Sequence, residues 1–308
     1  MKKSTVIILV IAFMAVVCSG LVALVMLTTR TVGAEPVHLY ITPATTEEDL
    51  LGQLAPAVDN PPMFSMLCHA LDYEPSARPG HYIAEPGTKY LDLARKLRNG
   101  QQDPIRLTIG KFRLPHDLEA YLDRKLMHDD FRVPLDSFHI VRPDTYEFYW
   151  TVTPAQFMQR MEREYRKTGL DKETVILAAI VEEETNNAAE KPLIASVYLN
   201  RLKKGIPLQA DPTVKYAVGD FSIKRILNKH LQTESPFNTY LHTGLPPAPI
   251  CLPSKSSVDA VLHAPETGYL YFCASPAMDG THRFAATLAE HNRNAAAFHA
   301  ALDRKGLR

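Results

Sequence analysis

The sequence has little glycine or cysteine, and it lacks the short signatures of several large enzyme classes. None of the 12 histidines stands in a His-Glu-x-x-His segment or another paired metal-ligand spacing, which argues against a zinc hydrolase. There is no Gly-x-Ser-x-Gly turn for a serine nucleophile, and no glycine-rich loop that would hold a phosphate. We therefore expect an activity that needs neither a metal nor another cofactor.

The sequence also has no excess of positive or negative charge. Lysine and arginine number 34, as do aspartate and glutamate, so the formal net charge is zero and the pI is about 7.2. A nucleic-acid-binding domain normally carries a strongly basic surface. We expect no nucleic-acid partner.

Only four cysteines are present, and Cys18 lies in an apolar segment near the N-terminus. The other three are Cys68, Cys251 and Cys273, an odd number, so one disulfide at most can form among them. Their spacing matches no zinc site. The sequence leaves open whether any two of them pair.

The N-terminus carries the one long apolar run. Residues 6–27 are 22 uncharged residues, a length that spans a bilayer, and the two lysines before them favour a cytoplasmic N-terminus. A cleaved signal peptide is the alternative, but the apolar run continues too far beyond Ser19-Gly20 for a simple signal core. We expect a cytoplasmic tail at 1–5 and a single-pass inner-membrane anchor at 6–29, with the rest on the periplasmic, extracytoplasmic side.

Helix and strand patterns over the rest of the chain predict an α+β fold. Segments that alternate between strand-like and helix-like over residues 37–109 indicate a small α+β module. A connecting region follows at 110–150, with a helix at its start and a loop at 141–148. From 151 to 308 helical patterns dominate, joined by proline-rich loops and a short sheet that includes 269–273.

The segment Leu177-Ala-Ala-Ile-Val-Glu-Glu-Glu-Thr185 is an apolar run that ends in three carboxylates. In a helix, Leu177, Ile180 and Val181 lie beside the side chain of Glu184. Apolar surroundings take solvation away from a charged carboxylate, which raises its pKa until it can hold a proton near neutral pH. A general acid needs that property. The structural alternative is a buried helix whose solvated end carries acids.

Two segments downstream combine proline with polar and aromatic residues, as rigid binding loops do. They are Gln209-Ala-Asp-Pro-Thr213 and Ser235-Pro-Phe-Asn-Thr-Tyr240. Their composition suits recognition of sugar hydroxyl and amide groups, and ordinary linkers are the alternative. Asp211 could instead cap a helix, because Asp-Pro-Thr is also a common helix start.

Together, in this order, the acid-ended segment and the two loops resemble those of the endolytic murein transglycosylase family (MltG, or YceG-like). Other segments of the same resemblance are Ala195-Ser-Val-Tyr-Leu-Asn-Arg-Leu202, Gly244-Leu-Pro-Pro-Ala-Pro-Ile250, Tyr269-Leu-Tyr-Phe272, His282-Arg-Phe284 and Leu288-Ala-Glu-His-Asn292. Order and spacing hold from about residue 141 to 298, over half of the chain. The resemblance makes 151–308 a catalytic domain and 37–109 similar to a LysM-like module, and the N-terminal anchor fits the family layout.

The resemblance implies cleavage of internal MurNAc–GlcNAc bonds in nascent peptidoglycan glycan strands, without water. One carboxylic acid protonates the glycosidic oxygen; as a carboxylate it then helps the MurNAc 6-hydroxyl attack C1, which leaves a 1,6-anhydroMurNAc end. Most glycosidases need two carboxylates. The family pattern Val-Glu-x-Glu-Thr places this acid at Glu184. Glu182 is the alternative, two residues earlier and about 200° around a helix.

Six further residues line the substrate cleft if the resemblance holds: Gln209, Asp211, Thr213, Ser235, Asn238 and Tyr240. Glu183 stands where the family often has lysine, and we expect its charge to raise the pKa of Glu184 further. Structural roles are the stronger expectation for five others that could reach the cleft: Tyr146, Glu147, Trp150, His282 and His291.

Two other functions compete with this one. A non-catalytic peptidoglycan-binding scaffold of the cell-wall elongation machinery would depend on the LysM-like module alone. A glycoside hydrolase would consume water and leave reducing ends instead of anhydro ends. The partners that the resemblance implies are peptidoglycan glycan strands and peptidoglycan synthases.

Overall fold

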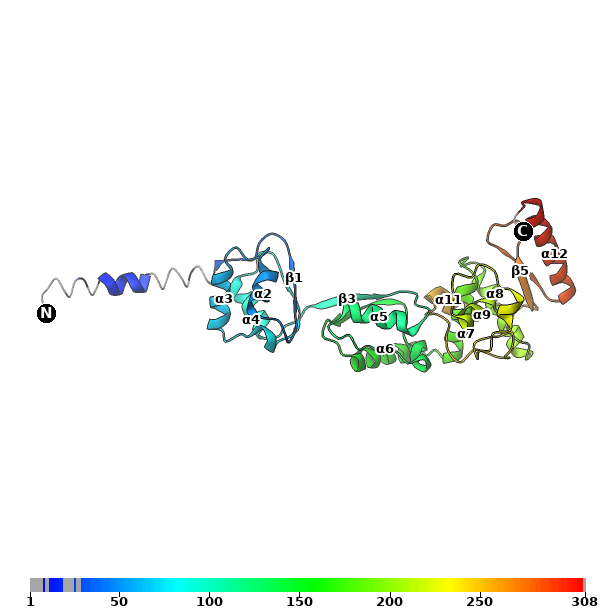
Figure 1. Ribbon diagram of the computed structural model, residues 1–308, viewed down its shortest axis with the longest axis horizontal. Coiled ribbons are helices and arrows are strands. Elements are labelled where there is room, and N and C mark those ends of the chain that lie inside the picture. The colour runs from blue at the N-terminus through cyan, green and yellow to red at the C-terminus, as the bar shows by residue number, and fades with distance from the viewer. Residues whose placement is uncertain (1–7, 9–10, 19–24, 26–28, 307–308) are drawn as a thin grey trace. The chain divides into compact units, whose positions relative to one another are not determined.

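The computed structural model describes residues 8, 11–18, 25 and 29–306, and the chain divides into two compact units (Figure 1). Unit 1 holds Met1–Leu107, Lys125–His128 and Glu147–Val152, and unit 2 holds the remaining segments up to Arg308. Among the described residues, no helix has the length and apolarity needed to cross a membrane. Much of the anchor predicted at 6–29 lies outside the described residues, so the anchor stays a prediction.

Unit 1 has the order strand, helix, helix, strand, helix. Its elements are β1 (Val37–Ile41), α2 (Glu47–Leu54), α3 (Pro61–Ala70), a 3₁₀ turn (Pro75–Ala77), β2 (Gly80–Ala84) and α4 (Tyr90–Arg98). β1 and β2 pair antiparallel, with Leu39 opposite Tyr82. Strands and helices were predicted here, but α3 was not. Its two leading prolines fit because they occupy the first helical positions, where no intrahelical donor is needed.

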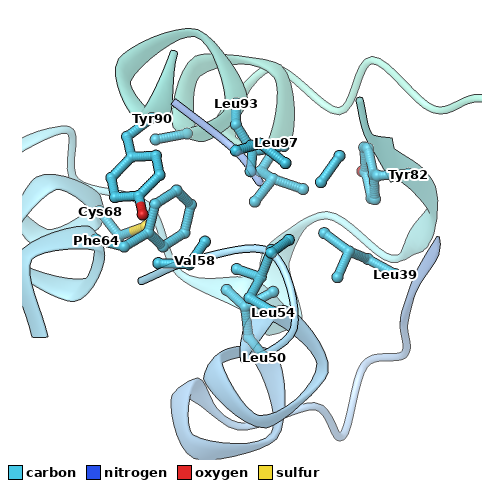
Figure 2. Close-up of a cluster of buried hydrophobic side chains, with 14 of the residues drawn as sticks. Leu39, Leu50, Leu54, Val58, Phe64, Cys68, Tyr82, Tyr90, Leu93 and Leu97 are labelled. Atoms are coloured by element: carbon cyan, nitrogen blue, oxygen red, sulfur yellow. The ribbon is translucent and has the colours of Figure 1, made fainter. Parts of the chain in front are cut away.

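The core of unit 1 is formed by one face of each helix against the two strands. Figure 2 shows Leu50 and Leu54 of α2 directed toward the same interior as Leu93 and Leu97 of α4. All four are essentially inaccessible to solvent. This packing accounts for the fold of the unit, because burial of apolar side chains is the dominant favourable contribution to folding.

A second two-stranded sheet is formed by β3 (Pro104–Ile109) and β4 (Asp144–Tyr149). The division between the two units falls within both strands. The loop predicted at 141–148 is therefore wrong for most of its length, because pairing with β3, more than thirty residues earlier, extends the backbone there. Pairing of that kind is tertiary context, which a local pattern does not carry.

Unit 2 is mainly helical. Its elements are α5 (Pro115–Lys125), a 3₁₀ turn (Leu135–Ile140), α6 (Pro154–Thr168), α7 (Lys172–Glu184), α8 (Lys191–Lys203), α9 (Asp211–Val218), α10 (Asn228–Leu231), α11 (Lys255–Leu262), β5 (Tyr271–Ala274), β6 (His282–Ala285) and α12 (Leu288–Arg304). β5 and β6 form an antiparallel hairpin. The prediction of a mainly helical region with a short sheet is confirmed, as is the overall α+β class.

The position of α7 follows from its two ends and its apolar middle. Asp171 caps the helix by accepting a 2.6 Å hydrogen bond from the backbone N–H of Thr174. Every residue from 175 to 181 is buried, against α8, α9 and α11 among other neighbours. At Thr185 the backbone becomes extended and ends the helix. The three glutamates therefore occupy its last turn.

Candidate active site

Glu184, the last residue of α7, is a half-buried carboxylic acid. Tyr198 on α8 donates a 2.5 Å hydrogen bond from its hydroxyl to Oε1 of Glu184. Burial raises the pKa of Glu184 to about 7, although the hydrogen bond from Tyr198 acts in the opposite direction. The negative charge of Asp211 adds to the rise. At neutral pH the group is thus divided between acid and carboxylate, which suits proton transfer in both directions.

A cavity of about 380 Å³ opens beside Glu184 in unit 2. Its size lies within the range of small-molecule sites in proteins. Its lining comes from α7, α8 and α9, from the β5–β6 hairpin, from α12 and from the loops between them. Residues that line it include Glu184, Tyr198, Arg201, Gln209, Asp211, Tyr240, Tyr271, Cys273, His282 and His291.

Glu182 faces a different part of unit 2. Its Oε2 accepts hydrogen bonds from Lys191 (3.0 Å), Ser254 (2.5 Å) and Ser257 (2.6 Å). Burial opposes ionisation of this carboxyl, but the three hydrogen bonds outweigh it and lower its pKa to about 2. Glu182 is therefore an ionised carboxylate at physiological pH that holds Lys191, Ser254 and Ser257 together, and it has no proton to give.

Glu183 is also held as a carboxylate. Its two oxygens pair with Lys111 Nζ at 2.7 Å and with Arg113 Nη2 at 3.0 Å. Burial opposes its ionisation, and these two cations more than compensate, so the pKa of Glu183 is lowered. Its charge raises the pKa of Glu184, as expected, but contributes less than burial of Glu184 itself.

Three of the six predicted cleft residues line the same cavity as Glu184: Gln209, Asp211 and Tyr240. Asp211 is the first residue of α9, and Ala210 holds the capping position, so Asp211 does not cap the helix. Instead its Oδ1 accepts a 2.7 Å hydrogen bond from the hydroxyl of Tyr240. The two predicted binding loops thus meet at this pair.

The other three predicted residues lie elsewhere. Thr213 is fully buried, and its hydroxyl bonds to Ala210 O (2.7 Å) and to the hydroxyl of Thr239 (2.8 Å). Asn238 is also fully buried and donates to the carbonyls of two residues in the preceding turn. Ser235 accepts from the backbone N–H of Phe237, within its own loop. None of the three lines the cavity, because their polar groups are used to hold the loops in shape.

Arg201 was missed by the sequence analysis. It donates to the carbonyls of Leu270 (2.7 Å), Pro207 (2.9 Å) and Leu208 (3.0 Å), and to Oε1 of Gln209 (3.1 Å). Gln209 has a positive φ of 52°, which is unfavourable for a residue with a side chain. Arg201 therefore ties this strained loop to Leu270, the residue before β5. Arg201 and Tyr198 are three residues apart on α8, the spacing that puts both on one helix face.

The remaining candidates take mixed positions. His282 lines the cavity, and its Nδ1 lies 2.9 Å from Oε2 of Glu190. Oε1 of the same carboxylate accepts a hydrogen bond from the backbone N–H of His282. His291 lines it too, with its ring stacked on Tyr271 at 5.3 Å, and burial lowers its pKa. Tyr146 is buried and donates to the carbonyl of Arg142.

Two of the residues weighed for the cleft fall in unit 1, namely Glu147 and Trp150. The ring of Trp150 packs edge-on against that of Tyr40 at 5.2 Å. All four cysteines are free, and Cys68 and Cys251 are buried. Within residues 8, 11–18, 25 and 29–306, no group of three or more His, Cys, Asp or Glu side chains could hold a metal ion.

Comparison with known proteins points to one family. The YceG-like family matches residues 39–297. A Bacillus subtilis (strain 168) protein named endolytic murein transglycosylase is 49% identical over 117 residues, which are 38% of this chain and 32% of that protein. A protein of the same name from Streptococcus pneumoniae serotype 2 (strain D39) is 30% identical over 128 residues, 40% of this chain and 23% of that protein. The chain thus spans about a third or less of these relatives.

Among solved structures, a yceG-like protein of Listeria monocytogenes is similar to this chain. It is 26% identical, with a TM-score of 0.49, and the match covers 84% of this chain and 99% of that one.

Proposed function

Because the chain belongs to the YceG-like family, we propose that it is an endolytic peptidoglycan transglycosylase. It cleaves internal MurNAc–GlcNAc bonds of nascent glycan strands and leaves 1,6-anhydroMurNAc ends. The names of its relatives in Bacillus and Streptococcus support the reaction class. The observation that carries the proposal is the position of Glu184, an acid with a pKa of about 7 at the wall of a cavity.

Glu184 performs both proton transfers. In its protonated form it gives its proton to the glycosidic oxygen, and the C1–O bond breaks with its electron pair on that oxygen. The resulting carboxylate takes the proton of the MurNAc 6-hydroxyl as O6 bonds to C1. Glu184 ends protonated, as it began, and no water is consumed.

Tyr198 assists by its hydrogen bond to Oε1 of Glu184. A donor to a carboxylate stabilises the charged form, which is the form that follows the first proton transfer. Because Oε1 already accepts from Tyr198, Oε2 is the oxygen left to approach the glycosidic bond. Glu182 and Glu183 are unsuited to this role, since their hydrogen bonds and ion pairs keep them ionised.

We further propose that residues 6–29 anchor the chain in the inner membrane, with 31–308 on the periplasmic side. The apolar run in the sequence supports this placement. Residues 37–109, which contain the strand–helix–helix–strand order described above, would be the LysM-like module, and peptidoglycan synthases the protein partners. An anchored enzyme of this kind meets glycan strands as they leave the membrane.

Mass spectrometry of glycan strands tests the proposal. Purified strands are incubated with the wild-type chain, with Glu184→Gln, and with Glu173→Gln as the control. Glu173 is an exposed residue of the first turn of the same helix, so the control makes the same change away from the cavity. We expect anhydro-ended internal fragments from the wild type and the control, and none from Glu184→Gln.

Other products would contradict the proposal and indicate a different function. Reducing ends would make the chain a hydrolase. An active Glu184→Gln variant would move the acid to another residue. No fragments from any sample, with glycan binding retained, would favour the non-catalytic scaffold.

A further inference from the structure

Asp211 puts a second carboxylate in the cavity of Glu184. Both residues line the cavity, from α9 and α7, two helices that pack together. Ala210 occupies the N-cap position of α9, and Asp211 follows it as the first helical residue. Its Oδ1 accepts a hydrogen bond from the hydroxyl of Tyr240.

The two carboxylates are close enough to influence each other. The charge of Asp211 is one of the causes of the raised pKa of Glu184, after burial and the opposing hydrogen bond of Tyr198. The positive charge of Lys215, one turn further along α9, lowers the pKa of Glu184 and so opposes the effect of Asp211. The charge of Asp211 is therefore felt at the carboxyl group of Glu184, in the cavity that both residues line.

We propose that Asp211 is a second catalytic residue: its carboxylate stabilises the positive charge that develops on C1 and the ring oxygen of MurNAc as the glycosidic bond breaks. This inference rests on the proposed function. In the cleavage step Glu184 loses its proton to the leaving oxygen, and the cationic sugar then faces the Asp211 carboxylate. Attack of O6 on C1 cancels the charge and returns a proton to Glu184, while Asp211 neither gains nor loses one.

This role differs from that of the second carboxylate in most glycosidases, which is a nucleophile or a base for water. Here the nucleophile is the substrate's own 6-hydroxyl. The second carboxylate is then needed only for its fixed charge. A charge held in place before the reaction stabilises the transition state without reorganisation, which is the most effective form of electrostatic catalysis.

Tyr240 is the positioning residue of the pair. Burial, and then its bond to Asp211, raise the pKa of the Tyr240 hydroxyl, so it stays a donor throughout the working pH range. By donating to Oδ1 it fixes the orientation of the carboxylate and leaves Oδ2 for the substrate. The cost of ordering the Asp211 side chain is thereby met before the substrate binds.

A purely structural role for the pair is disfavoured by the contacts behind it. The two loops are already joined by the fully buried Thr213–Thr239 hydroxyl pair at 2.8 Å. They are joined again by the backbone bond from Gln209 N to Thr239 O at 3.1 Å. A more exposed bond between Asp211 and Tyr240 adds little to a connection already made.

Steady-state kinetics of the full chain over pH 5 to 9 test the inference. The variants are Asp211→Asn, Tyr240→Phe, and Asp220→Asn as the control, which makes the same change on the exposed turn after α9. We expect Asp211→Asn to lower kcat by about tenfold or more with KM changed less than about threefold. The pH above which activity falls should also move down, because the pKa of Glu184 drops when the charge is lost. Tyr240→Phe should lower kcat by a smaller factor, and Asp220→Asn should leave kcat unchanged.

The inference fails if Asp211→Asn keeps the wild-type kcat and pH profile, or if only its KM changes. If Asp211→Asn does not fold, Tyr240→Phe decides, and an unchanged kcat and pH profile in that variant would overturn the inference. The proposed function is tested apart from it by Glu184→Gln. An inactive Glu184→Gln beside a fully active Asp211→Asn would leave the function standing and remove only the role of Asp211.

Discussion

The hydroxyl of Tyr198 on α8 donates to Oε1 of Glu184, the last residue of the neighbouring helix α7, over 2.5 Å. Two effects therefore meet on one carboxyl group. Burial raises the pKa of Glu184, and the bond from Tyr198 lowers it, with the outcome near 7. The acid strength of Glu184 depends on a residue fourteen positions away in the sequence.

Removing that bond should make Glu184 a weaker acid. In Tyr198→Phe the ring remains and the donor is lost, so the pKa of Glu184 should rise above about 7. The falling side of the pH–activity profile should then move to higher pH, opposite to the shift expected for Asp211→Asn. The measurement is kcat from pH 5 to 9. An unmoved profile would mean that the bond does not form in solution.

The buried acid should also cost stability. Between pH 4.5, the ordinary pKa of a glutamate, and about 7, the unfolded chain has released a proton that the folded chain still holds. The free energy of unfolding of the wild type therefore falls as pH rises through this window. Glu184→Gln lacks this loss, so it should gain up to roughly 3 kcal/mol on the wild type between pH 4 and pH 8. Urea unfolding at both pH values measures the gain, and a constant difference would contradict it.

Glu182 should behave in the opposite way. Glu182→Gln removes the anion that faces the buried Lys191, which should lower the free energy of unfolding by about 3 kcal/mol at pH 7. Because the folded pKa is about 2, the stabilisation is complete above pH 4.5 and lost as pH falls towards 2. The difference between the two proteins should therefore shrink in acid. Glu173→Gln is the matched control. Equal stability of the wild type, Glu182→Gln and Glu173→Gln would show that the Glu182 carboxylate does not stabilise the fold.

Glu183 lies beside two positively charged side chains, which a lysine at this position would repel. Lys111 and Arg113 both pair with it, so Glu183→Lys would set three positive charges together at this site. We expect a destabilisation of about 2 kcal/mol or more, which added salt should partly relieve. Thermal unfolding at low and high ionic strength provides the measurement. A variant as stable as the wild type would show that the two cations find other partners.

The three thiols outside the proposed membrane anchor should react in two groups. Cys273 is partly buried, whereas Cys68 and Cys251 are buried, and burial raises the pKa of both buried thiols. A thiolate is the reacting form. A thiol reagent added to the native protein should thus modify Cys273 first, and Cys68 and Cys251 only after unfolding. Peptide mapping identifies the modified sites, and a disulfide-linked peptide would contradict the free state.

Much of the helical framework was readable from local pattern. Thr153 and Asp171 cap α6 and α7 by accepting a backbone hydrogen bond in the first turn, and a proline stands in the first turn of α8. Their signal is local, since a cap acts on the first turn of its own helix. The predictions missed β4, α3 and α11. β4 owes its extended form to pairing with β3, far away in the sequence, and α3 begins with two prolines, which are unfavourable inside a helix.

The candidate site was predicted in part for a similar reason. The apolar neighbours of Glu184 are set by helix periodicity, so its burial could be anticipated. The partners Tyr198 and Asp211 come from other helices, and only packing brings them to the cavity. Thr213 and Asn238 were expected in the cleft because they lie in the two loop segments that resemble those of the family. The structure places both inside, where the loops need their hydrogen bonds.

The three adjacent glutamates at the end of α7 have a genetic consequence. A helix turns by about 100° per residue, so three identical side chains meet three unrelated environments. Loss of the first or second should reduce how much folded protein a cell contains, because less stable chains are degraded. Loss of the third should leave the amount intact and remove the activity. Abundance and specific activity, scored separately across mutants of this short stretch, would sort the three positions without any structure in hand.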